Sequence, residues 1–509
     1  MQNGGLRDFP CPYVLKERYF RINSGTEGWE FGYDDFTLRR EQNIIQAILL
    51  HHGLSAVVDN SNQIPKLHPR GQIVFNMGSS WSSPASKGQE IFKPADAVAT
   101  DPSEDPRYRR FTHFLKLNHH DHAIFYHNLQ YHNHLPYALA SAYIFGGSRD
   151  HLHDVYEECS KELEQWQDSP EEIDPDNWRA HLGDKRYQRA YLSFFEDEME
   201  QRGHDWKATL WHFLTDKQVD EGGNDWDNHQ LLYGLTEGIG HPLIHLGYAL
   251  ELEDKGLAME ALAMAAVSYN KVHELVDNPY PPLPFITTSE IREVLDKLFD
   301  DPNYDDICSK NGMGQPSKIL DDPPYVTFYG YVIQKERAAL LEAYQKQVEA
   351  SVMLFTTSHK AGNPQYDFFL AHTVTAAQAL RVILPHVDTQ QTWHLVRAHM
   401  VLMAQVYLSQ CRPTIKDWFV DDYDIGNKDW DYIKKKALES EYKYDSHYLK
   451  VLRSLQEFEK LFGTGEPGEK KYNMYLKAAV KFADEFSGWI GFSNASMKKL
   501  DIKDTNNTQ

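Results

Sequence analysis

Residues 366–409 read YDFFLAHTVTAAQALRVILPHVDTQQTWHLVRAHMVLMAQVYLS. Apolar side chains recur at helical spacing through this stretch, which predicts one helix over 365–384 and a second over 389–409. Asp388 stands at the N-cap position of the second helix, where its carboxylate can accept a backbone N–H. A helix that is almost wholly apolar is typical of a protein core, so this stretch predicts the interior of a large helical body.

The same periodicity predicts helices through most of the chain after residue 110. The Pro-, Gly-, Ser- and Asp-rich residues 59–107 are typical of a long loop, with one short strand at 72–77. We therefore predict an all-α fold, a large multi-helix single body with a loop-rich N-terminal region and minor strands. Its parts are an N-terminal helix plus loop (1–109), a helical catalytic domain (110–490) and a tail (491–509). Further helices are predicted over 37–51, 122–146, 151–166, 187–203, 206–215, 241–253, 258–277, 290–299, 335–356, 430–441, 445–462 and 472–486.

Composition restricts the class of function. The 509 residues carry 52 basic and 74 acidic side chains, a net charge of −22, so nucleic-acid binding is not expected. The four cysteines are far apart and form no CxxC pair, which indicates isolated thiols in a reducing compartment. No signal peptide is visible at the N-terminus. The most apolar stretch, 256–269, is interrupted by Glu260 and too short for a bilayer, so a cytoplasmic protein without a membrane segment is predicted.

A histidine pair lies in GHPLIHLGYALE, residues 240–251. His241 and His245 are four residues apart, so in a helix they share one face, which is a spacing that helical metal sites use. Pro242 fits the first turn of this helix, where its missing N–H costs nothing. The segment is not a zinc-protease HExxH motif, because Pro242 stands where the glutamate belongs. Two core histidines bonded to carbonyl groups are the alternative interpretation.

Two further histidines have apolar surroundings. His134 precedes the apolar part of FYHNLQYHNHLPYALASAYIFGG, residues 125–147, where one imidazole can reach a core pocket. His372 lies inside YDFFLAHTVTAAQAL, residues 366–380. A lone histidine in such a helix is commonly a hydrogen-bonded core residue, and its burial costs free energy without a partner.

His447 and Lys450 are three residues apart in DSHYLKVLRSLQEFEKLFG, residues 445–463, and share one helical face. A lysine turned inward on such a helix can lose its charge. A carbamate on Lys450 would then supply an oxygen ligand to a metal. The alternative is a lysine whose stem packs along the helix while its amine reaches water.

Several cofactor and nucleophile motifs are absent from the sequence. There is no Walker A motif and no GxSxG, and GLTEGIG at 234–240 lacks the dinucleotide-binding spacing. A Rossmann-type nicotinamide or flavin domain is therefore not expected, and no flavin fingerprint is visible.

Five segments together resemble the questin oxidase-like family, which is found largely in fungal polyketide gene clusters. The resemblance runs in register over about residues 110–490. One departure is Tyr137, where relatives often carry another histidine, so this position cannot be assumed to serve here. The segments are NHLPYALASAYIFGGS (133–148), FFEDEMEQRG (194–203), GIGHPLIHLGYALE (238–251), YDFFLAHTVTAAQAL (366–380) and HYLKVLRSL (447–455).

The resemblance implies an α-helical oxygenase that acts on anthraquinones or related aromatic polyketides. The reaction of the namesake resembles a Baeyer–Villiger oxidation, which opens the central quinone ring of questin with NADPH and dioxygen. By their place in the motifs, the resemblance singles out His134, His241, His245, His372, His447 and Lys450.

Oxygen chemistry of this kind needs an electron source and a group that activates dioxygen. Imidazole suits iron, so we hypothesise a non-haem Fe(II) centre with ligands drawn from those five histidines and Lys450. Lys450 and His245 are also the candidates for acid–base catalysis. A reduced hydroquinone substrate can supply electrons itself, which would make NADPH accessory. Aromatic residues of the same helices are expected to line the substrate pocket: Tyr143, Tyr248, Phe368 and Phe369.

Three interpretations therefore remain open from sequence. The first is a Baeyer–Villiger-type monooxygenase of anthraquinones, and the second is an iron-dependent dioxygenase that cleaves a ring carbon–carbon bond. The third is a non-catalytic helical binding or scaffold protein whose histidines are core residues. The substrate and dioxygen are the expected partners of the enzyme, and the oligomeric state is left open.

Overall fold

The computed structural model describes residues 105–215, 230–270, 272, 290–305, 337–357, 365–416, 418–463 and 473–491, and four short strands before residue 74. The chain divides into two compact units, Met1–Ser86 and Lys87–Gln509. In the first unit, β1 (Asn23–Gly25) pairs antiparallel with β2 (Gly28–Glu30), and β3 (Ser55–Ala56) pairs in parallel with β4 (Gln72–Ile73). Strand β4 falls within the strand predicted at 72–77, whereas the helix predicted over 37–51 lies outside the described residues.

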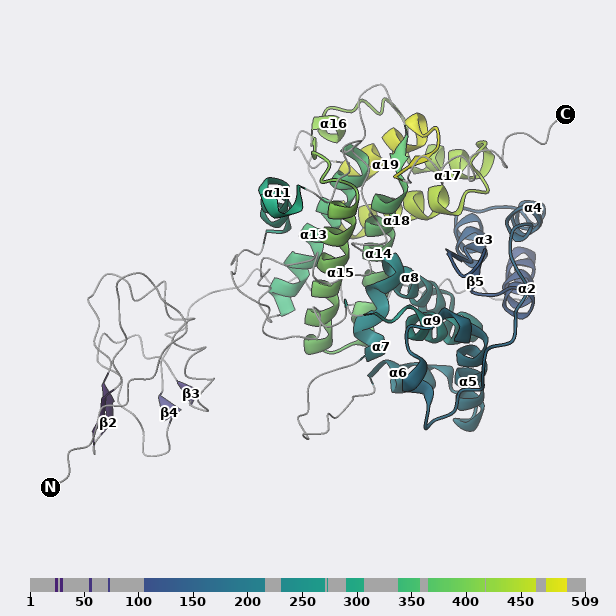
Figure 1. Ribbon diagram of the computed structural model, residues 1–509. Coiled ribbons are helices and arrows are strands. Elements are labelled where there is room, and N and C mark those ends of the chain that lie inside the picture. The colour runs from purple at the N-terminus through teal and green to yellow at the C-terminus, as the bar shows by residue number, and fades with distance from the viewer. Residues whose placement is uncertain are drawn as a thin grey trace. The chain divides into compact units, whose positions relative to one another are not determined.

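The second unit is built from helices, as Figure 1 shows, and the predicted all-α fold is confirmed. The α-helices are α2 (Pro106–Asp121), α3 (Leu135–Ile144), α4 (Arg149–Ser160), α5 (Gln188–Gln201), α6 (Trp206–Thr215), α7 (Gln230–Tyr233), α8 (Glu237–Leu252), α9 (Lys255–Ser268), α11 (Ile291–Asp300), α13 (Arg337–Thr357), α14 (Phe368–Ile383), α15 (Thr389–Ser409), α16 (Trp418–Asp421), α17 (Trp430–Glu439), α18 (Ser446–Phe462) and α19 (Met474–Glu485).

Short elements complete this unit. Strands β5 (Phe125–Tyr126) and β6 (Tyr131–His132) form an antiparallel pair, and β7 (Tyr366–Asp367) runs parallel to β8 (Trp489–Ile490). The 3₁₀ turns are Trp178–His181, Lys185–Tyr187, Gly234–Thr236, Pro302–Tyr304 and Leu384–His386.

Helix α14 lies in the interior of the helical unit, where it packs against α8, α13, α15 and α18 (Figure 1). All of its residues from Phe369 to Ile383 are buried, as its apolar sequence predicts. The contact with α8 is close at Gly247, because a Cβ there would lie only 2.8 Å from the Cβ of Ala379. The absence of a side chain at Gly247 therefore sets the spacing of these two helices.

Side-chain caps fix where several helices begin. Ser148 accepts the backbone N–H of His151 at the start of α4. Asp388 forms a capping box with Gln391 at the start of α15. The side chains of Asp367 and Asp445 accept backbone N–H groups at the starts of α14 and α18, so the two helices that carry His372 and His447 have defined first turns.

The helix predicted over 122–146 is wrong in its first half. Residues 125–132 form the β5–β6 pair instead, and α3 begins only at Leu135. The chain between the two strands holds three residues with positive φ, His127, Asn128 and Leu129, which no continuous α-helix accommodates. The helix predicted over 151–166 is shorter as well, since α4 ends at Ser160.

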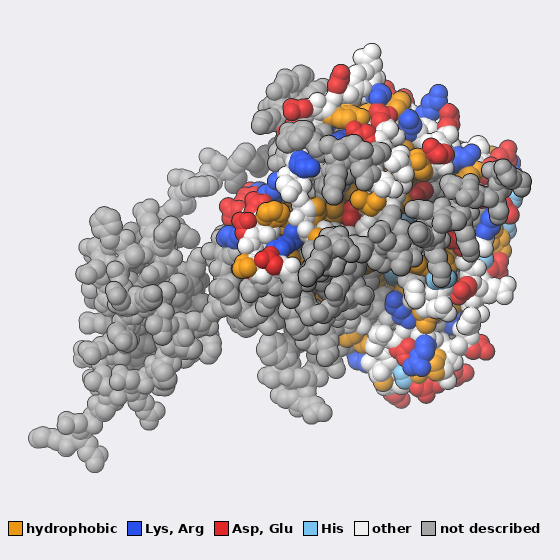
Figure 2. Space-filling view, turned by 45° about the horizontal axis from the view of Figure 1, so that its top comes forward, with side chains coloured by type: hydrophobic (Ala, Val, Ile, Leu, Met, Phe, Trp, Pro, Cys, Tyr) orange, Lys and Arg blue, Asp and Glu red, His pale blue; other side chains and the backbone are white. Residues whose placement is uncertain are grey.

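The segment Phe368–His386 is the one helical stretch of the described residues that is long and apolar enough to cross a membrane, with a mean hydropathy of 1.3 over its window. Packing accounts for this apolarity, because 89% of that window is buried inside the helical unit. On the face seen in Figure 2, the described surface carries acidic, basic and apolar side chains interspersed with one another.

The cysteines differ in part from the prediction. Cys159 is a free thiol, as expected. Cys411 takes part in a disulfide bond, so the prediction of isolated thiols is wrong at this position.

Candidate metal centre

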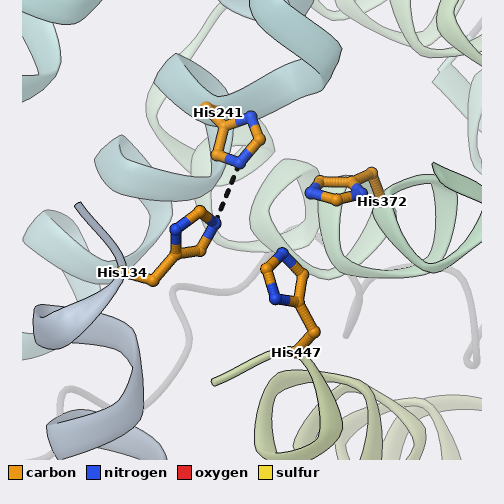
Figure 3. A group of neighbouring side chains, drawn as sticks. All are labelled: His134, His241, His372 and His447. Atoms are coloured by element: carbon orange, nitrogen blue, oxygen red, sulfur yellow. Dashed lines mark hydrogen bonds between the residues drawn. The ribbon is translucent and has the colours of Figure 1, made fainter. Parts of the chain in front are cut away.

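Four of the histidines singled out from the sequence converge in space. His134 directly precedes α3, while His241, His372 and His447 lie on α8, α14 and α18. One ring nitrogen from each lies within 4.8 Å of those from the other three. Figure 3 shows the four rings around a common centre, each ring presented by a different segment of the chain.

A left-handed turn places His241 in this group. Gly238, Ile239 and Gly240 have φ values of 55°, 61° and 75°, and regular helix resumes at His241. Pro242 therefore lies in a first helical turn, as predicted. The turn brings the carbonyl oxygen of Gly238 to 2.6 Å from His241 Nδ1, which fixes the orientation of the ring.

The rings of His372 and His447 are held where their helices begin. Asp445, the N-cap of α18, accepts a hydrogen bond of 2.7 Å from the indole Nε1 of Trp489. Trp489 lies in β8, which pairs with β7 directly before α14. The start of α18 and the start of α14 are thus joined through one short strand near the C-terminal end of the described chain.

Hydrogen bonds define the tautomers of three rings. His134 Nδ1 lies 2.5 Å from the carbonyl oxygen of His132, and His372 Nδ1 lies 2.9 Å from that of Phe368. Together with His241, each ring points Nδ1 at a carbonyl oxygen, which can only accept. The proton therefore sits on Nδ1, and in the neutral ring the lone pair is on Nε2.

Burial keeps these rings neutral. Burial and, after it, the positive charge of Lys450 lower the pKa of His372 to about 3. Burial, followed by the charge of Lys450 among other groups, also places the pKa of His134 and His447 well below the ordinary value. Burial and the neighbouring histidines lower the pKa of His241 in the same direction.

The neutral rings leave unmatched lone pairs. Nε2 of His134 and Nε2 of His241 are 3.0 Å apart, although both are acceptors in these tautomers. Among the described residues, Nε2 of His372 and Nε2 of His447 have no hydrogen-bond partner at all. A buried acceptor without a partner costs about 1–3 kcal/mol, so the group is unfavourable by itself and favours a bound cation.

The group fits a transition metal. Neutral imidazole nitrogens are good ligands for iron, copper, nickel and zinc. A metal-binding histidine usually donates its other N–H to a carbonyl or carboxylate, which is what His134, His241 and His372 do here. The described residues of this group supply no carboxylate, so any anionic ligand has to come from elsewhere.

Lys450 lies beside this group. Its side chain is 1% exposed, and its Nζ has no hydrogen-bond partner among the described residues. Burial lowers its pKa to about 7, a shift that Asp445 partly opposes. The Nζ stands 5.0 Å from the ring centre of Tyr137.

His245, also predicted as a ligand, lies outside the group of four. Its Nδ1 is 2.9 Å from the Tyr137 hydroxyl, and its Nε2 is 2.8 Å from Glu260 Oε2. Both ring nitrogens are thus engaged, although His245 shares a helix face with His241.

The four aromatic residues predicted to line the pocket differ in their contacts with the four-histidine group. Phe368 contacts the histidines, with its ring centre 4.3 Å from that of His447 and 4.9 Å from that of His372. Phe369 packs against Phe368. Tyr248 stacks on Tyr137 at 5.0 Å, and Tyr143 stacks on Phe111 at 4.8 Å.

Three functional candidates were not identified from the sequence. His132 stacks on His241 with ring centres 3.6 Å apart and planes 4° from parallel. Glu260 binds His245, and Trp489 binds the cap of α18. A signal existed for Glu260, because a single carboxylate within an apolar helix requires a buried partner. Neither stacking nor the Trp489 contact has a sequence signature.

Comparison with known proteins adds to this geometry. The family model described as questin oxidase-like matches residues 131–455, more than half of the chain. The chain belongs to the questin oxidase-like family. The matched residues include all four converging histidines and Lys450, and the resemblance stated from sequence is confirmed.

Curated relatives of this family member are similar at low identity. A Baeyer–Villiger oxidase of Paecilomyces divaricatus is 24% identical over 430 residues, which cover 77% of this chain and 91% of the relative. A questin oxidase of Aspergillus fumigatus is 23% identical over 433 residues, 77% and 92% of the two chains. A questin oxidase of Aspergillus terreus is 24% identical over 313 residues, 57% and 65% of the two chains. The family member is accordingly an oxidoreductase, and the non-catalytic interpretation is not retained.

Proposed function

We propose that this protein is an oxygenase that opens the quinone ring of an anthraquinone-type aromatic polyketide, by a Baeyer–Villiger-type oxidation at an iron ion held by four histidines. The observation that carries the proposal is the convergence of four imidazoles, of which His134 is half-buried and the other three are buried. In three of the four rings Nδ1 is bonded to a carbonyl and Nε2 is free for a ligand. The names of the relatives, questin oxidase and Baeyer–Villiger oxidase, support the substrate class and the reaction type.

His134, His241, His372 and His447 would hold the metal, which supplies the activation of dioxygen that closed-shell aromatics need. The two electrons for monooxygenation come from the hydroquinone form of the substrate, and NADPH is accessory because it serves to reduce the quinone. The aromatic ring of Phe368 lies against His372 and His447, so it is suited to position a planar substrate beside them. The expected setting is a cytoplasmic enzyme of fungal secondary metabolism.

Lys450 is proposed to bind carbon dioxide. Addition of the neutral amine to carbon dioxide gives a carbamate and releases one proton, which converts an unpartnered buried nitrogen into an anionic oxygen ligand. The four histidines of the group bring no negative charge, and a carbamate would compensate part of the charge of a divalent ion. Lys450→Met would lack the carbonyl signal that carbon-13 bicarbonate is expected to give in the NMR spectrum of the wild type.

Metal analysis of the purified protein tests the centre. Wild-type protein prepared without chelators should contain about one iron per chain by plasma mass spectrometry, and His372→Ala should contain almost none. His399→Ala is the matched control, because His399 is equally buried but bonds Gln347 and the carbonyl of Thr373 instead. Full iron content in His372→Ala, or equal losses in both variants, contradicts the proposed centre.

Oxygen-18 labelling tests the reaction. With labelled dioxygen and a reduced anthraquinone, a Baeyer–Villiger-type monooxygenase places one labelled atom in the ring-opened product and the other in water. Two labelled atoms in the product favour the alternative, an iron-dependent dioxygenase that cleaves a carbon–carbon bond. Absence of oxygen consumption with a series of anthraquinones refutes both.

A further inference from the structure

A continuous chain of hydrogen bonds leads away from the four-histidine group. The Tyr137 hydroxyl is 2.9 Å from His245 Nδ1, and His245 Nε2 is 2.8 Å from Glu260 Oε2. The other oxygen of Glu260 is 2.6 Å from His119 Nδ1, and His119 Nε2 is 2.9 Å from Glu196 Oε1. The members come from five different helices, α3, α8, α9, α2 and α5, so tertiary folding alone assembles the chain.

Solvent exposure increases steadily along this chain. Tyr137 is 0% and His245 1% exposed. The exposed fraction of the side chain rises to 4% at Glu260, 24% at His119 and 32% at Glu196. One end therefore lies in the interior and the other meets water.

The inner end lies against the candidate metal centre. The ring of Tyr137 meets the ring of His134 edge-on, with centres 5.3 Å apart. The amine of Lys450 stands 5.0 Å from the centre of the same Tyr137 ring. A group bound at the four histidines would therefore be close to Tyr137.

The charges in the outer half are defined by mutual hydrogen bonding. Burial would raise the pKa of Glu260, but its hydrogen bonds to His119 and His245 prevail and hold it at about 2. Burial would lower the pKa of His119, but its hydrogen bonds to Glu196 and Glu260 raise it to about 10. Glu260 is thus a carboxylate and His119 an imidazolium, which together carry no net charge.

The donor and acceptor roles in the inner half follow from this state. A carboxylate only accepts, so His245 donates from Nε2 to Glu260. In the neutral ring, Nδ1 of His245 then accepts from the Tyr137 hydroxyl. The Tyr137–His245–Glu260 part has the roles of a hydroxyl, a base and an orienting carboxylate, the arrangement that moves a proton in acid–base catalysis.

We propose that Tyr137, His245, Glu260, His119 and Glu196 form a charge-compensated proton relay that takes a proton from an aromatic hydroxyl at the four-histidine group and releases another to water at Glu196. This inference rests on the proposed function, because the relay serves a phenolic or hydroquinone substrate bound there.

The proton transfers balance at each atom. The substrate O–H bond breaks as an O–H bond forms on Tyr137, whose own proton passes to His245 Nδ1 in the same step. The Nε2–H bond of His245 breaks as an O–H bond forms on Glu260, and the Nε2 proton of His119 leaves through Glu196. A carboxylate–imidazolium pair becomes a carboxylic acid and a neutral imidazole, so the relay itself stays without net charge, and the one new charge is that of the deprotonated substrate hydroxyl. The reverse sequence returns the proton when dioxygen is reduced to water.

Chemical rescue at the outer end tests the relay. His119→Ala leaves a partly exposed cavity that free imidazole can enter, so its turnover should fall about 100-fold and recover with added imidazole. His120→Ala is the matched control, because His120 is the next residue on α2, with a side chain that is 87% exposed and bonded only to Asp121 among the described residues. Glu260→Gln retains the shape of the side chain but should not respond to imidazole. The iron content of the folded variants should equal that of the wild type.

Proton release gives a second readout that does not depend on turnover. Binding of a dihydroxyanthraquinone to wild-type protein, in weakly buffered solution with a pH indicator, should release about one proton per site. The milder variants His119→Gln and Glu196→Gln should release much less. Equal release by wild type and His119→Gln, or no response of His119→Ala to imidazole, overturns the relay. The proposed oxygenase function is refuted by a different result, namely that wild-type protein consumes no oxygen with any anthraquinone.

Discussion

Replacing Gly247 with alanine should push α8 and α14 apart and weaken metal binding at the four histidines. The added Cβ would lie 2.8 Å from the Cβ and 2.9 Å from the Cα of Ala379, whereas ordinary contacts begin at 3.4 Å. The two helices must therefore separate by about 0.6 Å at this point, since neither a Cβ nor a Cα can rotate away. Overpacking of this kind should lower the free energy of unfolding by about 1–3 kcal/mol.

The same displacement reaches the candidate metal centre. His241 lies on α8 and His372 on α14, and their ring centres are 4.8 Å apart. Metal sites tolerate changes of only about 0.2 Å in ligand distance, so a shift of about 0.6 Å should cost roughly 10–100-fold in metal affinity.

Urea unfolding followed by circular dichroism, and chelator competition for the bound metal, measure the two effects. Gly203→Ala is the control, because Gly203 has a positive φ of 69° but a Cβ there would meet nothing within 4 Å. It should lose about 1 kcal/mol through backbone strain alone and bind metal normally. The double variant Gly247→Ala/Ala379→Gly should recover only in part, because the contact with Cα remains. Wild-type metal affinity in Gly247→Ala would refute the reasoning.

Three further predictions concern other positions. The two glutamate partners of His119 raise its pKa to about 10, although burial opposes this shift. The contribution of protonated His119 to the stability of the folded protein is therefore complete below about pH 6.5 and is lost as the pH rises to about 10. In that range the unfolding free energy of wild type should fall more steeply than that of His119→Gln, by up to about 1.4 kcal/mol per pH unit, and parallel curves from urea titrations would contradict this. Trp489→Phe loses the hydrogen bond to Asp445 and should lower stability by about 1–2 kcal/mol by thermal unfolding, an effect that should vanish in an Asp445→Asn background. Gly240→Ala places a Cβ 3.0 Å from the Leu402 side chain at a residue with a φ of 75°. The variant should therefore lower the free energy of unfolding by about 2–4 kcal/mol and lose metal. Equal effects in Gly203→Ala would show that backbone strain alone is responsible.

Local sequence predicts most of the helical body because capping residues and apolar spacing lie within each helix or directly beside it. The helix over 389–409 is found at Thr389–Ser409, with an aspartate cap at one end and continuous apolar spacing behind it. The β5–β6 pair is different, because Tyr131 and His132 have no alternating pattern and pair only two residues each. Its conformation depends on positive φ angles at non-glycine residues, which the surrounding structure imposes.

The sequence indicates His241 and His245 as candidate site residues, but it does not distinguish what each of them would do. Spacing places His241 and His245 on one face of α8, and sequence alone cannot say which neighbours meet that face. The structure provides a carbonyl of a left-handed turn for His241, and Glu260 from α9 for His245. In the sequence Glu260 stands out only as an interruption of an apolar stretch, although a buried carboxylate needs a partner as much as a buried histidine does.

The partner of the second ring nitrogen decides what each of these two histidines can do. A carbonyl oxygen is neutral, so it fixes the proton on Nδ1 of His241 without favouring the imidazolium, and burial then leaves a lone pair suited to a metal. A carboxylate stabilises an imidazolium, so His245 against Glu260 is suited to carry a proton instead. On the two proposals above, helix α8 presents a metal ligand and, one turn later, a proton carrier on the same face. The two histidines differ in role because Gly238 offers a neutral carbonyl oxygen whereas Glu260 offers a charged carboxylate. The spacing of the histidines does not produce this difference.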